Sequence, residues 1–332
     1  MQISAGGYIG DGAGRSVVDS FIENLGLARD EGFRRFWCAQ LPWEPDLLTL
    51  LAVAVREVDG IEVGTGVLPI QIQHPSQLAQ RALLVNQIAG GRLKLGLGVS
   101  HPNWTEKLWG IAFGRPVRLM REYLDALLPL LAGEPGAAVG EMITNRATLR
   151  LSGASAPAVY LGALGPQMLR LAAQRCAGTV TWMTGPKTLT EYIVPTLREA
   201  AAAAGRPEGA VRVVAALPIC VTDDVAATRA QAAEQLALYA QLPSYRAMLD
   251  REGAAGPEDI ALIGSETTVS ERIAELAIGG VDECAALVFG ASDEDLARTR
   301  ALLRTYNIHH RPATVDQTNV GPVSGPRRLK GV

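Results

Sequence analysis

Short runs of apolar residues alternate with longer amphipathic segments along most of the chain. Eight of these runs predict β-strands, and most are apolar throughout, which is typical of parallel strands covered on both faces of a sheet. They occupy residues 2–9, 35–39, 61–70, 93–100, 158–164, 178–183, 211–221 and 284–291. The segments between them carry apolar residues at spacings of three and four, which predicts helices packed against the strands.

The sequence marks the ends of two of the predicted helices. One begins at Pro116, a residue suited to a first helical turn, and stops near Gly133. Pro129 lies inside this pattern and is expected to bend or shorten the last turns. The helix before the last strand is expected to begin at a capping box formed by Thr268 and Glu271.

Eight strands that alternate with helices predict an α/β fold, a (β/α)8 TIM barrel over residues 1–306. The alternative is a doubly wound sheet, whose dinucleotide-binding form needs G-x-G-x-x-G after a strand; the nearest candidate, residues 96–101, ends in His101. Insertions are expected after strand 4 (residues 133–157, with a small β-hairpin) and after strand 7 (residues 241–265). Residues 307–332 form a polar C-terminal tail that contains Gly and Pro.

Composition narrows the class of protein. The net charge of −3 comes from interspersed charges, so no basic field exists to hold nucleic acid. The four cysteines are far apart and form no CxxC pair, which argues against a zinc site or a disulfide scaffold. The N-terminus lacks the features of a secretion signal, and the apolar runs are too short to cross a bilayer. We expect a cytoplasmic protein with no metal, nucleic-acid or membrane partner.

The end of the fourth predicted strand carries the first candidate for chemistry, because active sites of such barrels lie at the carboxyl ends of the strands. Ser100 and His101 stand there, followed by Trp104 and Trp109. His101 is either a proton donor with a near-neutral pKa or a histidine whose hydrogen bonds are satisfied by backbone at a loop corner. The residues alone leave both alternatives open.

Glycines mark two further strand ends. Gly162 and Gly165 bracket a turn before Pro166, where free N–H groups at a helix N-terminus would suit a phosphate or carboxylate, although an ordinary turn has the same composition. Gly64 and Gly66 lie in the third strand and indicate close approach of something flat, or an unusual backbone. His74, just before Pro75, is expected to be structural.

The second and sixth strands end in aromatic and apolar residues. Gln40, Leu41 and Trp43 follow the second strand and would suit a planar ring that needs few hydrogen bonds, or form a packed loop. Trp182 and Met183 end the sixth strand and form either a substrate wall or core. No GxSxG motif and no paired carboxylates occur at strand ends, so hydrolase chemistry finds no support.

Four stretches together resemble the luciferase-like flavin and deazaflavin oxidoreductases, and within them the actinobacterial, coenzyme F420-dependent branch. They are GTGVLPIQIQHPSQLAQRAL, GGRLKLGLGVSHPNWTEKLWG with the helix that follows it, LGALGPQMLRLAAQRCAGTVTWMTGP and QLPSYRAMLDREG. The resemblance implies a bacterial-luciferase-like TIM barrel, commonly a homodimer, with F420 or, in other branches, FMN across the carboxyl ends of the strands.

The resemblance also assigns site residues. A non-proline cis peptide would fall at Gly66–Val67, and the backbone of residues 162–165 would grip the cofactor phosphate. The implied cofactor contacts are Gln40, Gly66, Val67, Ser100, His101, Gly162, Ala163, Leu164 and Gly165. The expected substrate contacts are Leu41, Trp43, Trp104, Trp182 and Met183.

One departure from the family sets the expected direction of the reaction. The sugar-phosphate dehydrogenases of this family have an Asp-His pair where this chain has Gln40 and Leu41, and a glutamate where it has His101. Without the usual base, we expect a reductase that uses reduced F420 to transfer a hydride to an activated C=C or C=N bond of a small molecule or natural-product intermediate. His101 is expected to donate the proton. The alternatives are an FMN-dependent luciferase-like monooxygenase and a non-catalytic F420-binding barrel.

Overall fold

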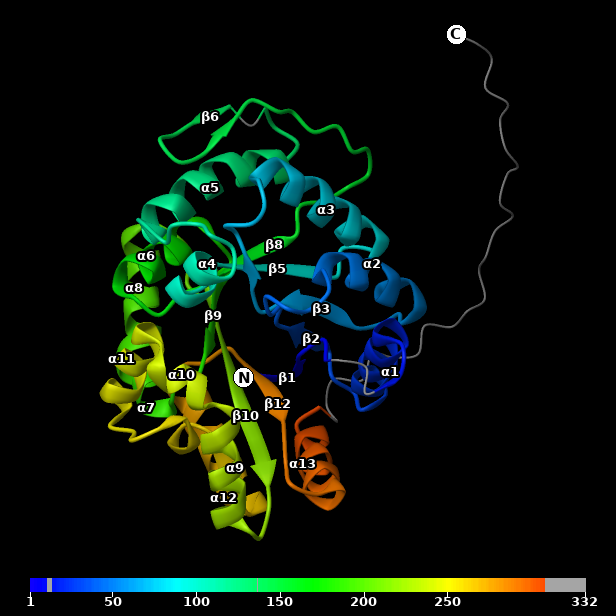
Figure 1. Cartoon of the computed structure of the whole chain (residues 1–332), viewed down its shortest axis with the longest axis vertical. Helices are drawn as coiled ribbons and strands as arrows, with labels where there is room; N and C mark the ends of the chain where they lie inside the picture. The colour runs from blue at the N-terminus through cyan, green and yellow to red at the C-terminus, as the bar shows by residue number, and fades with distance from the viewer. Residues whose placement is uncertain (11–13, 136, 308–332) are drawn as a thin grey trace, which may run out of the picture.

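The computed structural model describes residues 1–10, 14–135 and 137–307, and it confirms the predicted TIM barrel. Eight parallel strands close on themselves in the order β1, β2, β3, β5, β8, β9, β10 and β12, with β12 paired to β1. Their bounds are β1 (Gln2–Gly7), β2 (Arg35–Cys38), β3 (Glu62–Thr65), β5 (Leu93–Gly98), β8 (Ala158–Gly162), β9 (Gly178–Trp182), β10 (Arg212–Val221) and β12 (Glu283–Val288). Figure 1 shows the helices arranged around these strands.

The third predicted strand is interrupted by an unusual backbone. It divides into β3 and β4 (Leu68–Pro69), and the Gly66–Val67 peptide between them is cis, as the resemblance implied. A Cβ on Gly64 would lie 2.4 Å from the Trp37 ring, so only glycine admits that flat side chain here. Both sequence signals in this strand are therefore confirmed.

The main helices outside the barrel follow the predicted alternation. They are α1 (Val17–Asp30), α2 (Leu47–Glu57), α3 (Pro75–Ile88), α5 (Pro116–Leu131), α6 (Pro166–Arg175), α8 (Val194–Ala203), α9 (Val225–Gln235), α12 (Glu266–Ile278) and α13 (Asp293–Thr305). Shorter helical segments are α4 (Pro102–Lys107), α7 (Pro186–Thr188), η2 (Leu189–Ile193) and η3 (Pro257–Asp259). His74 caps α3 by accepting a hydrogen bond from the Ser76 N–H, a structural role as expected.

Two details of the helices differ from the sequence prediction. Helix α5 runs through Pro129 to Leu131 and is not shortened, because the Ala132 N–H still closes the last turn on the Leu128 carbonyl. Helix α12 does not begin at a Thr268 capping box. Its N-cap is Ser265, whose side chain accepts the Thr268 N–H, so the helix starts three residues earlier than expected.

Both predicted insertions are present. After the fourth barrel strand, β6 (Ala138–Val139) and β7 (Thr144–Asn145) form the expected antiparallel hairpin, which lies beyond α5 in Figure 1. Glu122 of α5 holds this hairpin by accepting the N–H groups of Met142 and Ile143. After β10, α10 (Ala237–Gln241) and α11 (Pro243–Glu252) are followed by a short strand, β11 (Leu262–Gly264), that pairs with the end of β10.

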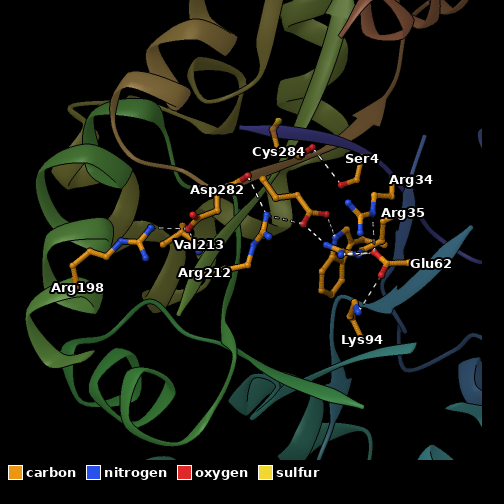
Figure 2. Close-up of polar contacts among 12 residues, drawn as sticks. Ser4, Arg34, Arg35, Glu62, Lys94, Arg198, Arg212, Val213, Asp282 and Cys284 are labelled. Carbon is orange, nitrogen blue, oxygen red and sulfur yellow. Dashed lines mark hydrogen bonds and ion pairs between the residues drawn. The ribbon is translucent and has the colours of Figure 1, made fainter. Parts of the chain in front are cut away.

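Charged side chains fill the amino end of the barrel. Figure 2 shows Arg35 bound to Glu62, which also receives Lys94 at 3.1 Å, and Arg35 pairs as well with Glu283. Glu283 is fully buried and accepts the Trp37 indole N–H at 2.7 Å. This network ties four strands together at one end and leaves the carboxyl end of the barrel for a cavity.

Two further expectations concern the C-terminal tail and membrane-spanning segments. Apart from Asn307, the predicted tail of residues 307–332 lies outside the described residues. In the part of the chain that the structure describes, every helix is too short or too polar to cross a membrane.

Candidate functional site

A cavity of about 450 Å³ opens at the carboxyl ends of the barrel strands. Its walls come from the residues that follow β1, β2, β5 and β8, from the last residues of β9, from the β3–β4 junction, and from α10 and α11. Twelve of the fourteen cofactor and substrate contacts expected from the sequence line it, as does Trp109; the twelve are Gln40, Leu41, Gly66, Val67, Ser100, His101, Trp104, Gly162, Ala163, Leu164, Gly165 and Trp182. The strand-end rule therefore locates most of the candidate site.

Two expected substrate contacts lie elsewhere. Met183 is 1% exposed and belongs to the hydrophobic core, so its placement on a substrate wall is corrected: the chain turns at a positive φ of 51° there, and the side chain packs inward. Trp43 is 64% exposed and stands outside the lining, with its ring edge-to-face against Trp104 at 6.0 Å. It borders the rim of the cavity.

Glycines shape the floor of the cavity around Val67. A Cβ on Gly98 would lie 2.5 Å from Val67 Cγ2, and a Cβ on Gly162 would lie 3.3 Å from it. Because Val67 lines the cavity, a larger residue at either position would displace its side chain and reduce the space in the cavity. The two glycines thus leave room for a flat group beside Val67.

The turn after β8 meets the cavity at a helix N-terminus. Helix α6 begins at Pro166 with Gly165 as its N-cap, and no side chain caps the first turn. The N–H groups of an uncapped first turn are available to an anion, and the helix dipole favours negative charge there. The segment thus fits the phosphate-gripping role that the resemblance implies.

Gln40 and Leu41 offer no base. The Gln40 side-chain oxygen accepts the Leu47 N–H at 3.0 Å, so its amide is engaged at the start of α2. The backbone N–H of Leu41 donates to Glu44 at 2.8 Å, which fixes the loop after β2. Neither side chain at this strand end takes up protons at neutral pH.

His101 lies in an aromatic environment. Its ring is 5.0 Å from that of Trp104 and 5.4 Å from that of Tyr245, and its side chain does not cap α4, although the residue is the N-cap. Burial lowers the pKa of His101 to about 4, since no carboxylate offsets the loss of water. The expectation of a near-neutral pKa is therefore wrong, and the imidazole is neutral at pH 7.

Three tyrosines that sequence reasoning did not single out also line the cavity: Tyr8, Tyr239 and Tyr245. Tyr8 directly follows β1, so the strand-end rule applied to the first strand would have found it. Tyr239 and Tyr245 come from α10 and α11 of the second insertion, where no strand end marks them. Tyr245 lies within one of the stretches that carry the family resemblance.

The cavity is uncharged. Among the described residues that line it there is no Asp, Glu, Lys or Arg, and the histidine is neutral at pH 7. Elsewhere in the described part of the chain, no cluster of three or more His, Cys, Asp or Glu side chains is placed to hold a metal ion. The site is therefore a mostly apolar pocket with neutral hydrogen-bond donors and one uncapped helix N-terminus.

An apolar cavity at the carboxyl ends of the barrel strands, with an uncapped helix end beside it, is the usual place for a ligand in such a barrel. The sequence profile of the luciferase-like monooxygenases matches residues 4–283. The chain belongs to that family, and it is a luciferase-like oxidoreductase.

Two relatives of similar sequence are named as redox enzymes. A Mycobacterium tuberculosis protein, provisionally named a coenzyme F420-dependent oxidoreductase, is 31% identical over 68% of this chain and 69% of its own. A 5,10-methylenetetrahydromethanopterin reductase of Methanolobus tindarius is 29% identical over 79% of this chain and 83% of its own.

Solved structures share the fold at low identity. The coenzyme F420-dependent tetrahydromethanopterin reductase of Methanopyrus kandleri superposes with a TM-score of 0.78 at 20% identity, covering 93% of this chain and 99% of that one. A type II Baeyer-Villiger monooxygenase component from Pseudomonas putida, in complex with FMN, has a TM-score of 0.72 at 19% identity, with 93% and 97% covered. Enzymes of both cofactor types thus share this barrel.

Proposed function

We propose that the protein is a reductase that uses reduced coenzyme F420 to transfer a hydride to an activated C=C or C=N bond of a small molecule or natural-product intermediate. The lack of a base at Gln40 and Leu41 carries this proposal. Alcohol oxidation needs a group that accepts the hydroxyl proton, whereas reduction of an activated double bond needs a proton donor. The names of the two curated relatives support F420 as the cofactor.

The cavity fits such a cofactor. The backbone of residues 162–165 would hold its phosphate, and its ring would meet Gln40, the Gly66–Val67 peptide, Ser100 and His101. When bound, a deazaflavin supplies hydride chemistry, and the protein supplies position and protons. The FMN-bound neighbour of the same fold supports FMN as the second candidate, which would make the protein a monooxygenase.

His101 acts in this proposal as a neutral imidazole. With a pKa of about 4 it carries no extra proton at pH 7, so a proton that it gives comes from the ring N–H and is replaced from water at the other nitrogen. We therefore assign His101 as a proton relay to the reduced substrate. Leu41, Trp104 and Trp182 would form the apolar walls around that substrate, with Trp43 at the rim.

The setting of the protein is also inferred. The four cysteines are buried free thiols, which suits a reducing, cytoplasmic compartment. A homodimer and an actinobacterial origin remain predictions from the family resemblance.

A turnover experiment tests the direction of the reaction. The protein is loaded with reduced F420 without oxygen and mixed with a panel of enones and imines, and loss of the reduced cofactor is followed by absorbance. We expect oxidation of the cofactor by activated double bonds and none of the reverse reaction with secondary alcohols and oxidised F420. Alcohol oxidation at a comparable rate would contradict the proposal, and binding without any turnover would favour the non-catalytic alternative.

The His101→Ala variant tests the relay. We expect single-turnover hydride transfer, measured at saturating F420, to slow by about 100-fold, in the range of a general acid–base contribution. An unchanged rate in a folded variant would remove His101 from the mechanism.

A further inference from the structure

A continuous series of aromatic rings crosses one side of the cavity. The Tyr8 and Trp182 rings are 6.5 Å apart, Trp182 and Tyr239 5.7 Å, and Tyr239 and Tyr245 5.2 Å. Each contact is edge-to-face, so the rings fix one another's orientation. The series joins the end of β1, the end of β9 and the second insertion, and it reaches His101 through Tyr245.

Polar atoms converge at the Tyr239 hydroxyl within this series. Its oxygen lies 3.4 Å from the Tyr8 hydroxyl. The Trp182 ring packs edge-to-face against the Tyr239 ring, and its indole N–H is buried without a hydrogen-bond partner. Because an indole N–H only donates, this wall of the cavity carries one unused donor beside two hydroxyl groups that are able to donate.

Both phenols are protonated at pH 7. Burial raises the pKa of Tyr239, and the hydrogen bond with the Tyr8 hydroxyl works against that rise. Burial also raises the pKa of Tyr8, and the neighbouring Tyr239 raises it further. Each hydroxyl is therefore able to donate a hydrogen bond.

The rest of the cavity limits what such a donor can recognise. No carboxylate is among the described residues that line the cavity, although the charge of Glu44, in the loop after β2, raises the pKa of both Tyr8 and Tyr239. A neutral substrate with an oxygen acceptor would meet a preoriented O–H in an apolar surrounding, where a hydrogen bond is stronger than in water.

We propose that the Tyr239 hydroxyl, supported by Tyr8 and Trp182, hydrogen-bonds the carbonyl oxygen of an α,β-unsaturated carbonyl substrate. The substrate would thus be a C=C bond conjugated to a carbonyl. This inference rests on the proposed function and names its substrate class.

Reduction of such a substrate requires one hydride and one proton. Addition of a hydride to the β-carbon breaks the C=C π bond and moves its electron pair toward the carbonyl oxygen as an enolate, which Tyr239 stabilises through its hydrogen bond. The hydride, with its two electrons, comes from reduced F420, which is thereby oxidised. A proton from water, passed through His101, reaches the α-carbon and restores the carbonyl.

A binding comparison tests the inference without turnover. The probes are trans-4-phenylbut-3-en-2-one and trans-1-phenylpropene, which share an aromatic ring and an alkene but differ in the carbonyl. Their dissociation constants for the protein loaded with oxidised F420 are measured by equilibrium dialysis. We expect the wild type to bind the ketone about tenfold more tightly than the alkene, and Tyr239→Phe to lose that preference while its affinity for the alkene is unchanged.

Tyr192→Phe is the matched control. Tyr192 lies outside the cavity lining and stacks under Arg251, a contact that a phenylalanine ring preserves. The control should keep the preference for the ketone. Loss of the preference in both variants, its retention in Tyr239→Phe, or failure of the wild type to prefer the ketone would each overturn the inference.

The same assay separates this inference from the proposed function. If the protein binds FMN in place of F420, the comparison is made with FMN bound. A preference for the ketone that is lost in Tyr239→Phe would then support the carbonyl site, although the F420 assignment would be wrong. If F420-dependent reduction is observed but Tyr239→Phe still prefers the ketone, the proposed function is supported and the carbonyl site is not.

Discussion

His101 shows at the scale of one residue how burial changes the chemistry that a sequence position suggests. A histidine at a strand end points to a proton donor that titrates near neutrality. In the folded chain it stands among Trp104 and Tyr245, and the loss of water holds its pKa near 4. The sequence predicted that His101 lies at a strand end. It did not predict the aromatic surroundings of His101, because Tyr245 lies in an insertion 144 residues further along the chain.

The low pKa of His101 predicts a pH-dependent stability. On acidification the unfolded chain, with an ordinary pKa of 6.5, binds the proton before the folded chain does. Stability is therefore present in full above pH 6.5 and falls between pH 6.5 and about 4, by at most about 3 kcal/mol. Urea unfolding at pH 7 and pH 4.5 should show this loss in the wild type and a smaller one in His101→Phe. Equal losses in the two proteins would contradict the assignment.

The glycines around Val67 predict a selective effect on cofactor binding. Gly98→Ala places a methyl group 2.5 Å from Val67 Cγ2 and should displace that side chain into the cavity. We expect F420 affinity to fall by about tenfold or more, with stability lower by about 1–3 kcal/mol from overpacking. Fluorescence titration and urea unfolding measure the two effects.

Gly26→Ala is the control for this variant. Gly26 lies inside α1 with no atom within 4 Å of an added Cβ, so alanine should leave F420 affinity unchanged and raise stability by about 0.5–1 kcal/mol. Unchanged cofactor affinity in Gly98→Ala would show that Val67 does not form the cofactor floor.

At the scale of elements, the order and type of the barrel strands were predictable because buried parallel strands are apolar throughout. Boundaries were less predictable where local signals compete. Thr268 and Glu271 have capping-box spacing, but Ser265 is also a good N-cap residue, and the chain uses it. The short β11 carries too few residues to form a pattern, and only its pairing with β10 identifies it.

The N-cap of α12 gives a prediction at this scale. Ser265→Ala removes the oxygen that accepts the Thr268 N–H and should lower stability by about 1 kcal/mol. Thr268→Ala keeps that acceptor and should change stability by clearly less. Thermal or urea unfolding of the pair decides between them, and the reverse order would restore the capping box as the start of the helix.

Considered as a whole, the barrel has a buried charged network at its amino end and a cavity lined by uncharged residues at its carboxyl end. Arg35, Glu62 and Lys94 meet at the amino end (Figure 2), where Glu283 also pairs with Arg35. The described lining of the opposite cavity carries no Asp, Glu, Lys or Arg. Trp37 connects the two ends, because its indole N–H binds Glu283 and its ring lines the cavity. The sequence did not reveal this network, since its members are charged residues scattered over four strands.

Removal of Glu283 should therefore affect the whole protein. Glu283→Ala leaves Arg35 with one carboxylate fewer and the Trp37 N–H without its acceptor, and we expect a loss of about 3–5 kcal/mol in the free energy of unfolding. Glu283→Gln retains an acceptor and should lose less. Glu23→Ala, which removes an exposed ion pair with Arg15, should leave the urea midpoint unchanged. Equal effects of Glu283→Ala and Glu23→Ala would show that the buried network does not stabilise the barrel.

A competitive titration decides which cofactor the protein binds. The purified protein is titrated with F420 and with FMN, and quenching of tryptophan fluorescence is followed, since Trp37, Trp104, Trp109 and Trp182 line the cavity. We predict tight, saturable binding of F420 that FMN does not displace at equal concentration. Preferential binding of FMN would contradict it and make the protein a candidate monooxygenase of the same family.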